Sequence, residues 1–305
     1  MTIATGSRHS LFYVEEVTYG TTPAIPAFEP ICITGTSIGM TRDAIEAGCL
    51  SSDRQLKDVR NGNKQVGGGI ESELIFGVHD DFLEAALMGT WATDVLLAQT
   101  TRRSFTIERW FPGIDVPEYH RSTGIELSGF ELSVSPNAYV TMNYTAIGQE
   151  LSPEIAQIAG ATYAATSANV PYDSFTGEIL EGGAAIAVVT QLDLSLDNGM
   201  EPTFAVFNDT TLRPTDGKSR ITGTLTAYYE SRALYQKFIN GTNSSIVFTL
   251  TDPDGNDYLV ELPNIKYTGG NPDVSGEGPV TLALACSAIY DPATTSQIKI
   301  TRTAA

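Results

Sequence analysis

Apolar and polar residues alternate with a period of two along much of the chain. Between Leu192 and Leu196, for example, leucines alternate with Asp193 and Ser195. Such alternation is typical of a β-strand with one buried face. The pattern predicts strands at Gly69–Phe76, Ser104–Trp110, Ile125–Val134, Ala138–Ile147, Ala187–Leu196, Ile221–Tyr229, Ser245–Leu250, Tyr258–Leu262 and Val280–Ile289. Turn-forming clusters separate these segments, so we expect antiparallel β structure.

Helical patterns are few and short. The pair Asp80-Asp81 predicts the start of one helix, which stops at Gly89. Ser231 predicts the start of a second helix, which ends at Gly241. A third short helix is expected within Pro153–Gly160. Helices of this length are not stable alone, so we expect them to pack against a sheet.

The order of strands and helix occurs twice along the chain. When Val66–Leu74 is aligned with Ile221–Tyr229, Ile70 corresponds to Leu225. The other matching segments are Ile33–Met40 with Val189–Leu196, and Val140–Ala146 with Val280–Cys286. We therefore predict a mainly β fold of two tandem sandwich or barrel units, each with one short flanking α-helix.

The repeat suggests a division of the chain. We expect an N-terminal arm at residues 1–30, which becomes ordered on a partner, and a first unit at 31–148. A linker or clamp is expected at 149–186, where prolines, alanines and threonines are frequent. The second unit is expected at 187–290, and a C-terminal tail at 291–305.

The charge balance excludes several classes of partner. Eighteen Lys and Arg against 36 Asp and Glu give a net charge of −18, which argues against a surface that binds nucleic acid or anionic lipid. No stretch reaches the roughly 18–20 apolar residues of a membrane helix, and Met1–Leu11 lacks the apolar core of a secretory signal. The odd count of three cysteines indicates folding in a reducing cytoplasm, with Cys286 as a buried apolar residue.

Catalytic and metal-binding patterns are weak. His9, His79 and His120 lie far apart, and His79 is better explained as part of a helix start than as a metal ligand. Asp252–Asp257 resembles a calcium loop but lacks its sixth-position glycine and twelfth-position glutamate, so a hairpin turn is expected there. Gly62–Gly69 lacks the Gly-Lys-Ser/Thr of a phosphate-binding loop. We expect no catalytic residue, no cofactor and no bound metal, and therefore no enzyme.

The second unit resembles a known family. The run from Gly223 through Tyr229 and Phe238 to Gly241-Thr242, with the hairpin Ile246–Leu262 and the strand Val280–Ile289 after it, looks like the strand–helix segment and closing strands of bacteriophage tail tube proteins. Type VI secretion tube proteins are related to them. The resemblance implies a structural role: subunits join sheets edge to edge into rings, and rings stack into a hollow tube. The tube encloses a tape-measure protein during assembly and later conducts DNA through an acidic lumen.

The resemblance also implies partners and location. The main partner is a second copy of the chain, in a homotrimeric ring with six pseudo-equivalent units or, alternatively, a homohexamer. Others are the tape-measure protein, the tail terminator and the baseplate or distal tail proteins; DNA passes without specific binding, and no membrane partner is implied. The protein is expected in the host cytoplasm during assembly and in the virion tail afterwards. The alternative is a two-module β-sandwich that binds carbohydrate or protein at a virion or cell surface.

Strand faces supply candidates for the lumen. Glu71 and Glu73 share one face of their strand, and the corresponding strand of the second unit carries threonines there. The lumen-facing candidates are Glu71, Glu73, Asp193, Ser195, Thr224 and Thr226. The alternative places these faces on the outside of the tube.

Two long segments are candidates for ring stacking. Thr41–Gln65 and Asp197–Arg220 occupy the same place in their units and are longer than a hairpin requires. Their mixed charges are suited to setting the register between rings, although a solvated surface loop is the alternative. The stacking candidates are Asp53, Arg54, Lys57, Asp58, Arg60, Lys64, Arg213 and Lys218.

Overall fold

The computed structural model describes residues 3–50, 52–186, 189–274 and 276–305, and strands dominate it. The helical elements are η1 (Gly6–Arg8), α1 (Asp80–Ala86) and α2 (Arg232–Asn240). The strands before residue 149 are β1 (Ser10–Glu15), β2 (Ala27–Ile31), β3 (Ile33–Thr36), β4 (Gly39–Glu46), β5 (Val59–Glu73), β6 (Val95–Leu97), β7 (Phe105–Phe111), β8 (Glu118–Val134) and β9 (Thr141–Gly148).

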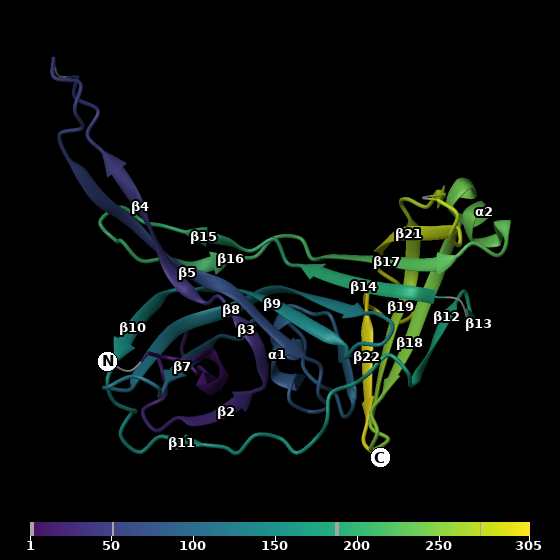
Figure 1. Ribbon diagram of the computed structural model, residues 1–305, viewed down its shortest axis with the longest axis horizontal. Coiled ribbons are helices and arrows are strands. Elements are labelled where there is room, and N and C mark those ends of the chain that lie inside the picture. Colours follow the sequence, from purple (N-terminus) through teal and green to yellow (C-terminus); the bar gives the residue numbers. More distant parts are fainter. Residues whose placement is uncertain (1–2, 51, 187–188, 275) are drawn as a thin grey trace.

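The strands of the connecting segment are β10 (Glu150–Glu154), β11 (Thr162–Tyr163), β12 (Gly177–Glu181) and β13 (Ala184–Ala185). The remaining strands are β14 (Val189–Asp197), β15 (Glu201–Thr203), β16 (Leu212–Thr215), β17 (Arg220–Tyr228), β18 (Asn243–Thr251), β19 (Asp257–Tyr267), β20 (Pro272–Asp273), β21 (Thr281–Ala288) and β22 (Lys299–Thr303). The mainly β fold is therefore confirmed. In Figure 1 the residues before 149 lie on the left and most of the second unit lies on the right, while β15 and β16 extend over the first unit. The connecting segment runs from β10 on the left, past β11 below, to β12 and β13 on the right.

One antiparallel sheet passes through both units, in the order β4–β5–β9–β8–β14–β17–β21. The junction is the ladder between β8 and β14, in which Gly129–Val134 pairs with Leu192–Asp197. The two units therefore share backbone hydrogen bonds rather than only side-chain contacts.

The two units also pair their strands in the same way. In the first unit β5 lies between β3 and β9, and in the second β17 lies between β14 and β21. β8 pairs with β7 through its first half and with β9 through its second half, and β19 pairs with β22 through its first half and with β21 at its end. Two rows of directly paired residues are Thr36–Ile70–Tyr144 in the first unit and Leu192–Leu225–Leu284 in the second.

Aromatic residues fill the core beneath this sheet. Phe82 of α1 is fully buried and contacts Tyr13, Phe105 and Tyr144, with ring centroids 4.7, 5.4 and 5.3 Å away. Such tilted and edge-on pairs add to the stabilisation from buried apolar area. The helix predicted from Asp80-Asp81 thus packs against the sheet, as expected.

The second predicted helix is also confirmed, together with its ends. Ser231 Oγ accepts a hydrogen bond from the Ala233 amide (3.3 Å), which satisfies one of the free N–H groups at the start of α2. The helix ends at Gly241, whose left-handed φ of 61° favours glycine. The third helix, expected within Pro153–Gly160, is wrong: β10 runs to Glu154 and pairs with β8 instead.

Both chain ends belong to the fold rather than extending from it. The expected arm contains β1, which pairs with β2 and β7 and buries Leu11 and Tyr13. The expected tail contains β22, which pairs with both β19 and β6 and buries Ile300. The apolar residues of these short segments alternate as in the longer strands. The strands that pair with them lie far away in the chain, so this pairing could not be inferred from the sequence.

Candidate functional site: a polar sheet face and two arms

The sheet shared by the two units has one apolar and one polar face. Leu192, Leu194 and Leu196 point into the core and are 2–3% exposed, whereas the residues between them point the other way. On the polar face the pairing builds two rows across six strands: Glu71–Asn143–Glu131–Ser195–Thr222–Ser287 and Glu73–Thr141–Ser133–Asp193–Thr224–Ala285.

All six lumen-facing candidates lie on this polar face. Five of them belong to the two rows, and Thr226 lies opposite Gln191 in the next row. Glu71 is exposed, and the others are half-buried. The structure therefore brings together residues from both units that are far apart in sequence.

The polar face also carries an acidic residue that the candidate set omitted, beside the candidate Asp193. Glu131 on β8 is exposed and lies between Asn143 and Ser195. Asp193 accepts hydrogen bonds from Ser133 Oγ (2.6 Å) and Gln191 Nε2 (2.8 Å). The alternation of Glu131 and Ser133 within Ile125–Val134 was a usable signal, because a period of two assigns both residues to the polar face.

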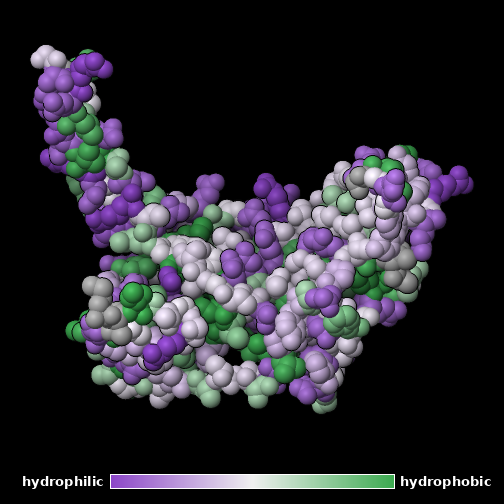
Figure 2. Space-filling model, viewed as in Figure 1, coloured by the Kyte–Doolittle hydropathy of each residue, from purple (hydrophilic) through white to green (hydrophobic). Residues whose placement is uncertain are grey.

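The segment Thr41–Gln65, expected to be a loop, is mostly a hairpin. We call residues 39–66 the first arm; it contains β4 and the beginning of β5. Figures 1 and 2 show it projecting from the body of the molecule. Several of its large apolar residues are exposed: Ile45 is 60%, Leu56 53% and Val59 51% exposed. A two-stranded hairpin in water is marginally stable, so this arm lacks the packing that normally supports such an element.

Five stacking candidates lie in the outer part of the first arm. Lys57 forms an ion pair with Asp53, and Arg60 Nε lies 3.2 Å from Asp58 Oδ2. Arg54 has a left-handed φ of 58° in the turn. All five residues are exposed, and exposed pairs of this kind stabilise a fold by at most about 1 kcal/mol.

The second long segment, residues 198–219, lies over the first unit instead of projecting. We call it the second arm; it contains β15 and β16. Lys64 donates its backbone N–H to the Asp209 carbonyl (2.7 Å), and its Nζ lies 3.0 Å from Asp209 Oδ2. Arg42 lies 3.2 Å from the same carboxylate. The hydrogen bond from Lys64 lowers the pKa of Asp209.

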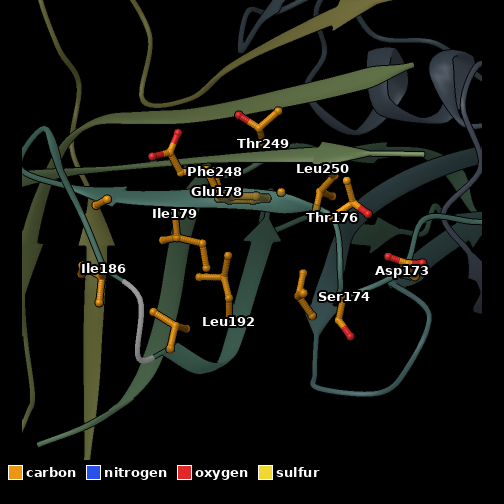
Figure 3. Close-up of a pocket in the computed structure, with 14 residues that line it drawn as sticks. Asp173, Ser174, Thr176, Glu178, Ile179, Ile186, Leu192, Phe248, Thr249 and Leu250 are labelled. Carbon is orange, nitrogen blue, oxygen red and sulfur yellow. The ribbon is translucent and has the colours of Figure 1, made fainter. Parts of the chain in front are cut away.

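A hollow of about 390 Å³ opens where β12, β14 and β18 meet. Figure 3 shows Ile179 and Leu192 side by side in it, with Asp173 at its edge. Its lining includes no histidine and no cysteine. Across the described residues, no three metal-binding side chains lie close enough to hold an ion.

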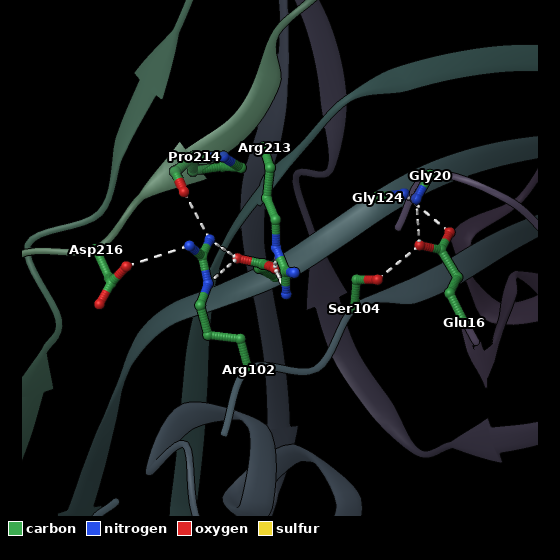
Figure 4. A network of polar contacts seen from close by, with 9 residues as sticks. Glu16, Gly20, Arg102, Ser104, Gly124, Arg213, Pro214 and Asp216 are labelled. Atoms are coloured by element: carbon green, nitrogen blue, oxygen red, sulfur yellow. Dashed lines mark hydrogen bonds and ion pairs between the residues drawn. The ribbon is translucent and has the colours of Figure 1, made fainter. Parts of the chain in front are cut away.

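A buried ion-pair network attaches the second arm to the first unit (Figure 4). Glu126, which is 1% exposed, pairs with Arg102 and with Arg213, whose Nε lies 2.7 Å from Glu126 Oε1. Arg102 also donates to the Pro214 carbonyl (2.6 Å) and pairs with Asp216 (3.2 Å). A charge this deeply buried requires such partners. The stacking candidates Lys64 and Arg213 are thus engaged within the chain.

Lys218, by contrast, is exposed near the base of the second arm. Which candidates pair within the chain could not be predicted, because Arg213 and Lys64 contact residues far away in sequence. The partners become visible only once the second arm is placed over the first unit.

Beside this network a second buried carboxylate holds the N-terminal segment in place. Glu16 accepts hydrogen bonds from the amides of Gly20 (2.7 Å) and Gly124 (2.9 Å). Ser104 and Thr106 donate their hydroxyl groups to it over 2.7 and 2.9 Å. These four donors compensate for the loss of solvation on burial.

These observations define a class: a β-rich protein with a long polar sheet face and two arms. The chain belongs to the phage tail tube protein family, whose model matches residues 6–288. The resemblance noted in the second unit is thereby confirmed and covers nearly the whole chain. A comparison with curated proteins found no match. Within the described residues, no helix is long and apolar enough to cross a bilayer.

Proposed function

We propose that three copies of this chain form a closed ring, and that rings stack into the tail tube of a phage. The continuous polar face is the observation that carries this proposal. Its rows cross the junction between the units without a break, so the same face can continue around a ring. Adding neighbouring sheets edge to edge would also cover the free edges of the sheet, which β proteins otherwise have to protect.

The proposed trimer rests on an internal duplication. The sequence match aligned Thr36, Ile70 and Tyr144 with Leu192, Leu225 and Leu284. These two sets are also the two rows of directly paired residues. An accidental match would not be expected to reproduce the register at three strands. With two units in each chain, three chains supply six positions around a ring.

We propose that the polar face lines the lumen. Glu71, Glu73 and Glu131 form no ion pair with any described residue, so the face carries uncompensated negative charge. Double-stranded DNA carries about one negative charge per 1.7 Å of its axis. An acidic wall would repel DNA and let it slide, whereas a basic wall would bind it.

The proposed tube has further partners. During assembly it encloses the tape-measure protein, and its ends contact the tail terminator and the baseplate or distal tail proteins. The turn of the first arm, which carries Asp53, Arg54 and Lys57, makes the contacts between rings. Assembly takes place in the host cytoplasm, and the finished tube is part of the virion.

Electron microscopy of the purified full-length protein tests this function. Hollow tubes with threefold symmetry and two similar units per chain are the expected result. Monomers that stay compact at high concentration would contradict the tube. Strict sixfold symmetry of chains would contradict the trimer.

A charge substitution tests the lumen. Changing Glu71, Glu73 and Asp193 together to lysine should leave assembly intact and slow DNA ejection, because phosphates would bind the wall. The control variant carries Glu178→Lys, Asp254→Lys and Glu277→Lys, which add the same charge at exposed positions off the two rows. If particles in which Glu71, Glu73 and Asp193 are lysine eject DNA at the normal rate, the lumen assignment is overturned.

A further inference from the structure

The two arms of the chain differ in what they contact. The second arm, which extends from the second unit, packs over the neighbouring first unit through Arg213 and Asp209. The first arm extends from the first unit in the same direction, away from the second unit (Figure 1). Its base contacts Asp209 of the second arm through Arg42 and Lys64, whereas its outer part projects from the body of the molecule. In a ring of alternating units, the next unit on that side is the second unit of another copy.

The register rows identify which residues of the two arms correspond. Asp58 precedes Ile70 by as many residues as Arg213 precedes Leu225. Asp58 in the first arm therefore takes the place of Arg213 in the second. The side chain of Asp58 forms an ion pair with the exposed Arg60 beside it, and 57% of that side chain is exposed.

The same rows identify the counterpart of Glu126. Glu126 on β8 lies opposite Ile147 of β9, and Lys266 on β19 lies opposite Ser287 of β21. Ile147 and Ser287 follow Tyr144 and Leu284 by the same number of residues. Lys266 is exposed and forms no ion pair with any described residue.

The charges of the two pairs are therefore reversed. Within the chain, a cationic arm residue, Arg213, meets an anionic sheet residue, Glu126. Between chains, an anionic arm residue, Asp58, would meet a cationic sheet residue, Lys266. Arg220 is also exposed and lies two residues before Thr222, which pairs with Ser287.

The apolar residues show the same correspondence. Leu56 and Val59 take the places of Thr211 and Pro214, both of which are buried in the second arm. In the first arm these two positions carry large apolar side chains that are half exposed. Contact with a partner would remove this apolar surface from water.

We propose that the first arm of one chain docks over the second unit of a second copy, as the second arm docks over the first unit within the chain. Asp58 then pairs with Lys266 of the second copy, and Leu56 and Val59 become buried beside this pair. This inference rests on the proposed ring. It identifies the surfaces that form the junction between chains and the contact that orients each chain as it joins the ring.

Charge reversal tests the pair in the full-length chain. Asp58→Lys and Lys266→Glu should each raise the protein concentration needed for assembly by about tenfold, because each places like charges together. The double variant should restore assembly to within about twofold of the unmodified chain. Asp254→Lys, at the exposed turn between β18 and β19, is the control and should assemble normally. Sedimentation measures assembly, and circular dichroism verifies folding.

The outcomes separate this inference from the proposed function. An unmodified chain that forms no rings would contradict the ring itself. If the unmodified chain assembles, single variants that assemble equally well would overturn the docking. Two impaired single variants whose combination gives no recovery would also overturn it, since recovery requires the two residues to meet.

Discussion

At the residue scale, burial of His79 links stability to pH. Its ring contacts Tyr144 Oη (3.1 Å), the Glu73 carbonyl (3.0 Å) and Ser72 Oγ (3.2 Å), and burial lowers its pKa to about 4. In the unfolded chain the pKa is 6.5. Between these values only the unfolded state binds the proton, so the free energy of unfolding falls as pH decreases, by about 3 kcal/mol for this group.

Urea unfolding at pH 7.5, 5.5 and 4.5 measures this effect. His79→Gln should show a shallower decrease of stability over that range than the unmodified chain, because it has no imidazole to protonate. Equal decreases in the two proteins would show that other groups determine the pH dependence. The prediction concerns the slope, since the substitution also alters the three contacts at every pH.

Glu126 gives a second prediction at this scale. Glu126→Gln removes the charge shared by Arg102 and Arg213, and should lower the free energy of unfolding by about 2 kcal/mol. Asp216→Asn is the matched control: its side chain is 50% exposed, so the change should cost less than about 1 kcal/mol. Urea unfolding measures both. Equal effects would mean that burial of Glu126 does not determine its contribution.

At the scale of elements, the outer turn of the first arm should control the length of the tube. Removing Asp53–Gln55 deletes charged residues beyond the last paired strand residues, and leaves β4, β5 and Asp58 in place. Rings should therefore form but fail to stack, as electron microscopy would show. Removing Gly276–Gly278, an exposed segment before β21, should leave tube length unchanged. Long tubes from the first variant would reject the role in stacking.

Strands and helices could be predicted from the sequence where a local pattern of residues determines them. All nine predicted strands are present, because each alternates between a core face and a polar face within a few residues. Ala187 and Val188, at the start of one of them, lie outside the described residues. The first arm was not predictable as strand, since both of its faces are exposed and its residues show no alternation. The turn-like Asn61-Gly62-Asn63 lies inside β5, where cross-strand pairing with β4 overrides local preference.

The six lumen-facing candidates share one face of the sheet, as the period of two within each single strand predicts; that this face lines a lumen stays a prediction. The sequence could not show that the strands belong to one sheet. That depends on the β8–β14 ladder, which joins residues separated by the whole connecting segment. The partners of Glu126 were hidden for the same reason.

At the scale of the whole molecule, the two units should unfold together. β22 pairs with β19 of the second unit and β6 of the first, and Arg302 stacks over Trp91 (4.6 Å). Ile300→Ala, in a strand position that is 3% exposed, should lower stability by about 3 kcal/mol. Calorimetry of the unassembled chain should show a single transition at a lower temperature. Two separate transitions would contradict this coupling.

The β8–β14 ladder also has a mechanical consequence. Half of the junctions in a six-unit ring would lie inside single chains, where the connecting segment keeps the two sides at a high effective concentration. Only the other half would have to form by collision and could separate again. Under torsion or internal pressure, a ring should therefore separate first at its three junctions between chains, while the two units within each chain stay joined.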